Sequence, residues 1–349
     1  MRVLVTGAAG FIGSAVVQAL HTAGHDVAAV DALIEQAHPA AASLPAGVER
    51  ADVRDLDTLR PLLRGVDIVV HQAAMVGAGT DAADLPLYAS HNDLGTTTLL
   101  AAMAEAGVHR LVLASSMVVY GEGRYACPLH GPVAPPARDP EALAAGEFDA
   151  TCPACGEVLG WELVDESAPM LPRSSYAASK VAQEHYAGAW ARQADASVVA
   201  LRYHNVYGPH MPQDTPYSGV AAIFRSALAA GQAPEVFEDG AQMRDFVHVR
   251  DVAAANALAL AAVADAGPGS LEAYNVCSGI PVSIGEVARI LSAAAGGAEP
   301  VTSGRFRASD VRHVVASPRA AADRLGFTAA IDPDSGLRAF VDEPLRPTR

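Results

Sequence analysis

The sequence predicts an α/β fold, in which helices cover both faces of a doubly wound parallel sheet and a smaller α/β domain follows toward the C-terminus. Short apolar runs alternate with Ala-rich segments of helix length, and this alternation is typical of parallel sheets. The runs are apolar at consecutive positions, as strands buried on both faces require. With 349 residues, 51% of them hydrophobic, the chain is long enough for one large or two interlocked domains.

The elements with the clearest pattern lie in the first two thirds of the chain. The predicted strands are Arg2–Thr6, Asp26–Asp31, Ile68–Gln72, Arg110–Ser115 and Val198–Tyr203. The predicted helices are Gly13–Ala23, Asp57–Leu63, Asn92–Ala106 and Tyr176–Gln193. We expect the first domain to cover residues 1–205 and to return at about 245–265, and the second to cover 206–244 and 266–349. The part after Phe327 is rich in proline and is expected to be a loosely packed terminus.

A glycine-rich turn follows the first predicted strand. Gly7, Gly10 and Gly13 are spaced G-x-x-G-x-x-G, which differs from the G-x-G-x-x-G of the usual dinucleotide fingerprint. The physical reasons for glycine are the same, because a tight turn, a close approach to pyrophosphate and close helix packing all exclude a side chain. The helix N-terminus then offers free N–H groups to phosphates. The turn therefore predicts a dinucleotide site in a Rossmann-type domain.

Asp31 ends the second predicted strand, where a carboxylate meets the ribose hydroxyls of adenosine. The same carboxylate would repel a 2′-phosphate, so NAD is favoured over NADP. Asp52 and Val53 follow the expected third strand and are predicted to hold the adenine.

Tyr176 and Lys180 stand four residues apart on a predicted helix, so they share one helix face. A lysine beside a tyrosine favours the phenolate, and we expect it to lower the pKa of the tyrosine toward neutrality. Such a tyrosine can act as an acid or a base, although Tyr/Lys pairs are also common on protein surfaces. Ser116 stands at the end of a predicted strand, where open α/β sheets bind their ligands. Its hydroxyl can hydrogen-bond a substrate oxygen.

At this point the chain resembles a known family, the extended short-chain dehydrogenases/reductases, in the nucleotide-sugar epimerase/dehydratase group. The matching stretches are Thr6–Ser14, His71–Ala74, Asn92 with Gly95 and Thr96, Ser115–Gly121, Tyr176 with Lys180, Arg202–Pro209, Phe237–Asp251 and Tyr274–Gly279. The resemblance implies a catalytic triad of Ser116, Tyr176 and Lys180. It also implies further contacts with NAD from Phe11, Ile12, Gln72, Ala73, Ala74, Asn92 and Tyr203, and from Tyr176 and Lys180.

The resemblance implies a nucleotide-diphosphate sugar as the partner. Asn205 and Arg244 are then expected to contact the sugar nucleotide, with Arg244 on the diphosphate, and Arg307 and Asp310 match an R-x-x-D element near its ribose and phosphate. Arginine also suits a diphosphate on physical grounds, because it forms charge-assisted and often bidentate contacts. The alternative for Arg244 is a structural ion pair with a neighbouring aspartate, Asp245 or Asp251.

The residues after Ser116 bear on the reaction. Members resembling 4,6-dehydratases carry an Asp-Glu pair there and decarboxylating members a Glu, whereas this chain has Met117 and Val118, which cannot move a proton. The hypothesis is therefore a 4-epimerase that oxidises C4 of a UDP- or dTDP-hexose and returns the hydride to the opposite face, with NAD retained. A 4-ketoreductase or dehydratase of the same family and a non-catalytic NAD-binding scaffold stay open. The sugar is open too, because His204 replaces the usual Phe.

Residues 124–170 interrupt the α/β pattern and are rich in Pro, Gly and acidic residues, which predicts an insertion with its own local order or a disordered loop. Two C-P-x-[H/C]-G units within it each resemble a zinc knuckle. They offer Cys127 with His130 and Cys152 with Cys155, a Cys₃His set that suits a structural zinc ion. The alternative is four unlinked polar residues in a loop. A metal there can order a lid beside Ser116 and Tyr176, because the insertion joins them.

The net charge of −15 at pH 7 makes nucleic acids and membrane surfaces poor partners. We see neither a transmembrane run nor a signal peptide, so we expect a cytoplasmic protein whose thiols are free or metal-bound. A homodimer is implied by the resemblance alone, through helices 92–106 and 176–193. Three histidines, His21, His25 and His38, are expected on the surface, and His248 is expected to fix packing between the domains.

Overall fold

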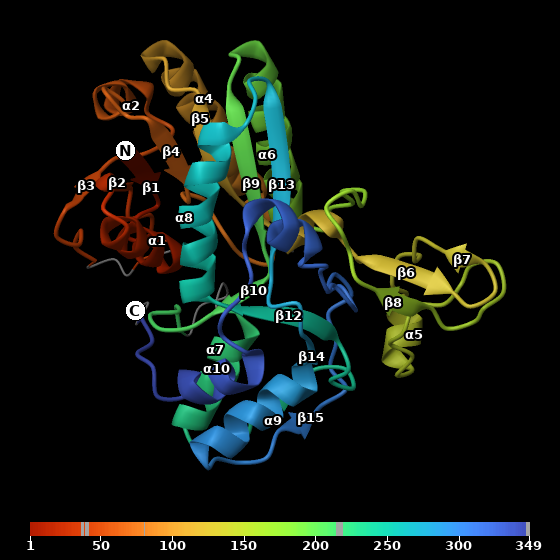
Figure 1. Ribbon diagram of the computed structural model, residues 1–349. Coiled ribbons are helices and arrows are strands. Elements are labelled where there is room, and N and C mark those ends of the chain that lie inside the picture. The colour runs from red at the N-terminus through yellow and green to blue at the C-terminus, as the bar shows by residue number, and fades with distance from the viewer. Residues whose placement is uncertain (36–37, 39–41, 80, 214–218, 347–349) are drawn as a thin grey trace.

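A seven-stranded parallel sheet forms the centre of the computed structural model, which describes residues 1–35, 38, 42–79, 81–213 and 219–346 (Figure 1). The strand order is β13-β9-β5-β4-β1-β2-β3, and every neighbouring pair is parallel. The strands are β1 Arg2–Thr6, β2 Asp26–Asp31, β3 Val48–Arg50, β4 Ile68–His71, β5 Arg110–Ser116, β9 Ser197–Tyr203 and β13 Ser270–Val276. The predicted fold class is confirmed, and each of the five predicted strands forms to within one residue.

Helices cover both faces of this sheet, as predicted. One face carries α1 Phe11–Thr22 and α8 Val249–Asp265. The other carries α2 Leu56–Leu62, α4 Gly95–Ala106 and α6 Ser175–Gln193. Successive residues of β1 alternate between the two cores, because side chains of a strand point to opposite faces: Val3 and Val5 pack on the first, Leu4 on the second. The short helices between are η1 Ala82–Asp84, α3 Leu85–Tyr88, the π-helical η2 Ala89–Leu94 and the 3₁₀ turn η3 Met117–Tyr120.

The second domain lies below the edge of the large sheet at which its strands end (Figure 1). Its strands are β10 Asn205–Tyr207, β12 Met243–His248 and β14 Pro281–Ser283 in one sheet, and β11 Glu235–Val236 with β15 Val301–Thr302 in another. Its helices are α7 Val220–Ala229, α9 Ile284–Ala295 and α10 Pro333–Phe340. Within the described part of the chain, no helix is both long and apolar enough to cross a membrane.

The C-terminal segment is not loosely packed, so that prediction is wrong. Leu337 and Phe340 of α10 are fully buried in the core of the second domain. Pro333 stands in the first turn of α10, where its missing N–H costs no hydrogen bond, and Asp332 caps the helix by accepting from the Ser335 amide. The proline that suggested an irregular terminus therefore begins a helix.

The domain division differs from the predicted one at two places. Strand β13 lies within the predicted second-domain range 266–349, yet it pairs with β9 at the edge of the large sheet. The π-helical η4 Ala321–Leu325 lies in the same range, and Leu325 packs in the core of the first domain. The chain therefore crosses between the domains more often than the sequence pattern indicated.

The insertion has its own order, which decides between the two alternatives for residues 124–170. A three-stranded antiparallel sheet joins β6 Arg124–Cys127, β7 Gly131–Pro132 and β8 Gly160–Glu162, and α5 Pro140–Ala144 lies beside it. We call residues 124–162 the arm, because they project from the rest of the molecule in Figure 1. A small core of its own includes Tyr125 and Leu159.

Candidate active site

The glycine-rich turn has the close contacts that its sequence predicts. Gly7 has φ 66°, and a Cβ there would lie 2.6 Å from the Ala73 nitrogen. A Cβ on Gly13 would lie 2.0 Å from the carbonyl oxygen of Gly7, so the helix can approach the turn only with glycine. Among the described residues, no side chain caps α1 at Gly10, which leaves the first N–H groups of the helix available to an anion. These features fit a dinucleotide.

A pocket beside the turn brings most of the predicted cofactor residues together. It is lined by Gly7, Gly10, Asp31, Asp52, Val53, Gln72, Ala73 and Ala74, and also by His38 and His91. Gly13 lies against the backbone of Gly7 in the turn. Phe11 packs against the core of the second domain, and Ile12 packs against the core of the first domain. The residues present thus fit the adenosine half of NAD at the ends of β1 and β2.

Asp31 is buried in this pocket and is ionised. Its carboxylate accepts from the backbone N–H groups of Ala9 (3.0 Å) and Leu33 (2.8 Å) and lies 3.5 Å from the His38 ring. Burial raises the pKa of Asp31, but the hydrogen bonds from His38 and Leu33 outweigh it and leave the pKa below its usual value. His38 was expected on the surface; it is 7% exposed, and this prediction is wrong because Asp31 draws the ring inward.

Two further predicted cofactor residues hold the sheet to its helices. Gln72 donates to Tyr203 Oη and to Asn256 Oδ1, each at 3.0 Å. Asn256, which the sequence analysis missed, is one of two buried polar residues in the Ala-rich helix α8, the other being Asp251. Asn92 accepts from the Met75 amide (2.7 Å) and donates to the Met75 carbonyl and to Ser179. The contacts of these side chains with NAD stay predictions.

Arg54 was also missed, and it shapes the adenine end of the pocket. Its guanidinium makes a bidentate contact with Asp52, at 2.6 Å at the closest, and donates to Ser90 at 3.0 Å. The hydrogen bonds from Arg54 lower the pKa of Asp52 although burial opposes them. The Asp52 carboxylate is therefore held in a fixed orientation at the end of β3.

The triad residues come from β5 and α6. Ser116 ends β5, and its hydroxyl lies beside the Tyr176 hydroxyl, whose pKa it lowers. Lys180 lies one turn further along α6, where its ammonium donates to the Ala114 carbonyl at 2.9 Å. The structure thus brings Ser116 and Tyr176 into contact and places Lys180 on the same side of α6.

The electrostatics of the pair differ from the expectation. Burial raises the pKa of Tyr176 to about 12, although the Ser116 hydrogen bond lowers it, and burial lowers the pKa of Lys180 to about 8. The expected lowering of the tyrosine pKa is therefore wrong for the protein alone, because burial disfavours the phenolate and the ammonium is turned to a carbonyl. A lysine with a pKa near 8 can release a proton close to neutral pH.

A buried ionic network supports the triad, and the sequence analysis missed it. Glu184, one turn beyond Lys180, accepts from the Ser115 hydroxyl (2.5 Å) and from Arg202 (2.8 Å). Both charged side chains are at most 5% exposed. Arg202 also donates to Tyr120 Oη at 2.8 Å. The network ties α6 to β5 and β9 directly behind Ser116.

The predicted substrate residues lie on the second domain. The Arg244 guanidinium donates to the carbonyl oxygens of Met243 (2.8 Å), Arg312 (2.9 Å) and Val311 (2.6 Å). The alternative of an ion pair with an adjacent aspartate is wrong, because Asp245 accepts from Ser278 and Gly279, and Asp251 from Ala330 and Ile331.

Two more predicted substrate sites have features that a ligand would use. The amide oxygen of Asn205 in β10 is buried and has no hydrogen-bond partner within the described residues. Arg307 lies over the Phe237 ring at 5.2 Å and 3.9 Å from Asp310. An unpaired buried acceptor is costly, so a donor from a bound molecule fits beside Asn205.

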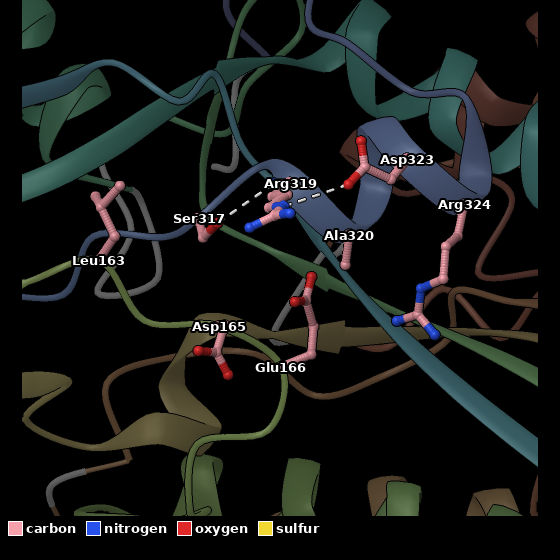
Figure 2. A pocket seen from close by; sticks show the side chains of 8 residues that line it. All are labelled: Leu163, Asp165, Glu166, Ser317, Arg319, Ala320, Asp323 and Arg324. Carbon is pink, nitrogen blue, oxygen red and sulfur yellow. Dashed lines mark hydrogen bonds and ion pairs between the residues drawn. The ribbon is translucent and has the colours of Figure 1, made fainter.

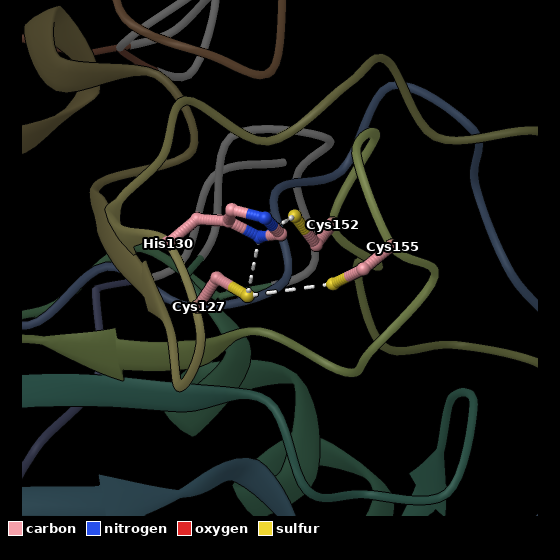
Figure 3. Close-up of side chains that lie close together, drawn as sticks. All are labelled: Cys127, His130, Cys152 and Cys155. Atoms are coloured by element: carbon pink, nitrogen blue, oxygen red, sulfur yellow. Dashed lines mark hydrogen bonds between the residues drawn. The ribbon is translucent and has the colours of Figure 1, made fainter.

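The four predicted metal ligands converge in the arm (Figure 3). His130 Nδ1 lies 3.4 Å from Cys127 Sγ and 3.5 Å from Cys152 Sγ, and the Cys127 and Cys155 sulfurs are 3.7 Å apart. All four ligand atoms lie within 4.8 Å of one another. Tetrahedral zinc with Zn–S bonds of about 2.3 Å places two sulfurs about 3.8 Å apart. The alternative of four unlinked residues is therefore wrong, and the cluster fits a zinc ion.

A separate hollow lies where the end of the insertion meets η4 (Figure 2). Its lining is mostly charged and includes Asp165, Glu166, Arg319 and Arg324. Arg319 pairs with Asp323 at 3.4 Å. The hollow contains none of the predicted site residues, and we assign it no role.

Comparison with known proteins agrees with this geometry. The model of the "NAD dependent epimerase/dehydratase family" matches residues 3–139 and 149–277. The chain belongs to this family. Its first matched range ends inside the arm, and its second begins before the second pair of cysteines. The predicted family is therefore confirmed, and within the arm the match leaves out residues 140–148.

Several proteins similar to this chain are named 4-epimerases. The dTDP-L-rhamnose 4-epimerase of Burkholderia thailandensis is 34% identical over 93% of this chain and 90% of that protein. The UDP-glucose 4-epimerase of Mycolicibacterium smegmatis is 31% identical over 98% of both chains. The solved structure of UDP-glucose 4-epimerase from Thermus thermophilus with NAD has a TM-score of 0.75 and 31% identity, and covers 98% of both chains. The predictions of enzyme class and of NAD are confirmed.

Proposed function

We propose that this protein is an NAD-dependent nucleotide-sugar 4-epimerase that acts on a UDP- or dTDP-hexose. The observation that carries the proposal is the Tyr176 hydroxyl beside Ser116 at the end of β5, where Met117 and Val118 follow Ser116 in the chain. Met117 and Val118 supply no acid or base for elimination or decarboxylation, so proton transfer at C4 is the chemistry left to the site. Relatives named for a dTDP-sugar and for UDP-glucose support both nucleotides.

Each side chain of the triad has a distinct task in this reaction. Bound NAD supplies a hydride acceptor at C4 and later the donor. Tyr176 takes the proton of the C4 hydroxyl and later returns it. Burial raises the pKa of Tyr176 to about 12, so forming the phenolate needs a change in the charges around the tyrosine. Ser116 orients the same oxygen by hydrogen bonding. Lys180, whose ammonium is buried beside Ala114, stabilises the phenolate once the cofactor and substrate are in place.

The substrate is held between the domains in this proposal. Asn205 accepts a hydrogen bond from the sugar nucleotide through its buried amide oxygen, which has no partner among the described residues. Arg244 and Arg307 face the diphosphate and ribose phosphate, and Asp310 the ribose. Gly7, Gly10, Asp31 and Asp52 hold NAD on the opposite side of the triad.

The test is incubation with UDP-glucose, UDP-N-acetylglucosamine, UDP-glucuronate and their dTDP counterparts, followed by chromatographic separation of C4 epimers. One pair should interconvert without added NAD, and denatured enzyme should release NAD at close to one per chain. Tyr176→Phe should lower conversion by about 10²–10⁴-fold while it retains NAD. If all substrates return unchanged, or if conversion consumes a reduced cofactor, the epimerase proposal is wrong.

We propose further that Cys127, His130, Cys152 and Cys155 bind a structural zinc ion. Their spacing of 3.4–3.7 Å between contacting ligand atoms supports this, as does a Cys₃His set, which suits closed tetrahedral zinc. Elemental analysis of protein purified without chelator should give one zinc per chain, and Cys155→Ser should reduce it. Cys277→Ser is the matched control, because Cys277 is buried away from the cluster and should leave the zinc content unchanged.

A homodimer through α4 and α6 also belongs to the proposal. The two helices contact each other, and Leu94, just before α4, and Tyr186 on α6 are 53% and 45% exposed. Large apolar side chains on adjacent helices suit an interface with a second copy. Light scattering should give twice the chain mass, and Tyr186→Glu should lower it; a monomeric wild-type protein would refute the dimer.

A further inference from the structure

Arg138 is a buried arginine of the arm that contacts the second domain. Arg138, whose side chain is 5% exposed, donates to Glu238 at 2.7 Å and to the Asp310 carbonyl at 3.0 Å. It also donates to the Phe148 carbonyl within the arm at 3.3 Å. One guanidinium therefore ties the arm to two segments of the second domain.

Glu238 holds an unusual backbone conformation to make this contact. It is one of four described residues other than glycine with positive φ, at 54°, and it is 2% exposed. Its carboxylate accepts from Arg138 and, at 2.9 Å, from Arg312. A strained conformation persists only where surrounding contacts hold it, so two buried arginines fix Glu238 in place.

Arg312 carries the connection to the predicted substrate site. Its side chain is 1% exposed and donates to Asp149 of the arm (2.8 Å) and to Asp239 (2.7 Å). The backbone carbonyl oxygens of Arg312 and Val311 in turn accept the Arg244 guanidinium, at 2.9 and 2.6 Å. Contacts thus run without interruption from the arm to Arg244.

The position of the cysteines shows how a metal would act on these contacts. Arg138 and Asp149 both lie between the two knuckles, in the loop that joins His130 to Cys152. A metal bound to both knuckles closes that loop at its two ends, and a closed loop has fewer conformations to lose when its side chains are ordered.

We propose that Arg138 is a positioning residue for the nucleotide diphosphate. The metal-bound arm holds Arg138, which fixes Glu238 and Arg312 and thereby orients Arg244 toward the diphosphate. The inference rests on the proposed function, because it takes a sugar nucleotide as the ligand and zinc in the arm. It predicts that the arm controls binding of the nucleotide while NAD retention and the chemical step proceed on the first domain. Substrate recognition would then depend on the arm as well as on the second domain.

The test compares Arg138→Gln and Arg138→Lys with wild type in the NAD-loaded full chain. UDP and dTDP serve as separate probes in titration calorimetry, beside KM and kcat for the sugar nucleotide that is converted. Arg138→Gln should weaken nucleotide binding and raise KM at least tenfold, with kcat within threefold and NAD content unchanged. Arg138→Lys should recover part of the affinity, because it keeps the positive charge beside Glu238 but lacks the several planar N–H donors of the guanidinium.

Arg124→Gln is the matched control, since Arg124 lies in the same arm but forms exposed pairs with Glu162 and Asp165. It should leave KM unchanged. Cys155→Ser should raise KM as Arg138→Gln does, and the double variant should add little to either. Equal nucleotide affinity in wild type and Arg138→Gln, or a fall in kcat at unchanged KM, overturns the inference alone. A wild-type protein that binds neither UDP nor dTDP overturns the proposed function with it.

Discussion

Acidification should destabilise this protein through His204. The side chain is 4% exposed, and burial, with Arg244 nearby, lowers its pKa to about 4 although Asn275 opposes this. In an unfolded chain, histidine titrates near pH ~6.5. As the pH falls from about 6.5 to about 4, the unfolded chain therefore takes up a proton that the folded chain refuses, and the free energy of unfolding decreases. Between pH ~7 and pH ~5 the loss at this one residue is about 2 kcal/mol.

His204→Phe removes the titrating group and keeps a ring of similar size. Urea unfolding from pH ~5 to pH ~8, on samples of equal NAD and metal content, should show a loss on acidification about 2 kcal/mol smaller than in wild type. His204→Asn serves as the control, because it also removes the titrating group but fills less of the site. It should reduce the loss of unfolding free energy on acidification, and it should be less stable than His204→Phe at every pH. If wild type and both variants lose the same free energy of unfolding, burial of His204 does not set its pKa and the reasoning fails.

Three further substitutions test the site and its support. Tyr176→Phe should lower the epimerisation rate by about 10²–10⁴-fold with NAD still bound, and an active variant would remove Tyr176 from the chemistry. Gly13→Ala should cost about 1–3 kcal/mol and release NAD, because its Cβ would stand 2.0 Å from the Gly7 carbonyl oxygen; a stable variant with full NAD content would contradict this. Glu184→Gln should lower the free energy of unfolding by about 3–5 kcal/mol, since it leaves Arg202 buried without its carboxylate, and an unchanged urea midpoint would refute that.

Local patterns account for what the sequence predicted well. The strand, turn and helix around Gly7 depend on residues close in the chain, and Ser116 at a strand end follows from the rule for parallel sheets. The four side chains of the Cys₃His cluster were found because each knuckle is itself a local motif.

Contacts between distant residues account for most of what was missed. Glu184 and Arg202 look like solvent-exposed charges in the sequence, and only the packing of α6 on the sheet shows that they are buried. The sign of the Tyr176 pKa shift failed for the same reason, because spacing shows that a lysine is near but not how deeply the hydroxyl lies. At Pro333 the sequence did not distinguish a proline that ends structure from one that begins a helix.

Because the chain returns to the large sheet as β13, the unfolding of the two domains should be linked. β9 is buried along its whole length because β13 pairs with it from the far side, after the chain has built much of the second domain. A chain ended at residue 205 would leave β9 as a long apolar edge, which invites aggregation. The sheet is completed only when later residues have been made, so the two domains should melt in a single cooperative transition and neither should be obtainable in soluble form without the other.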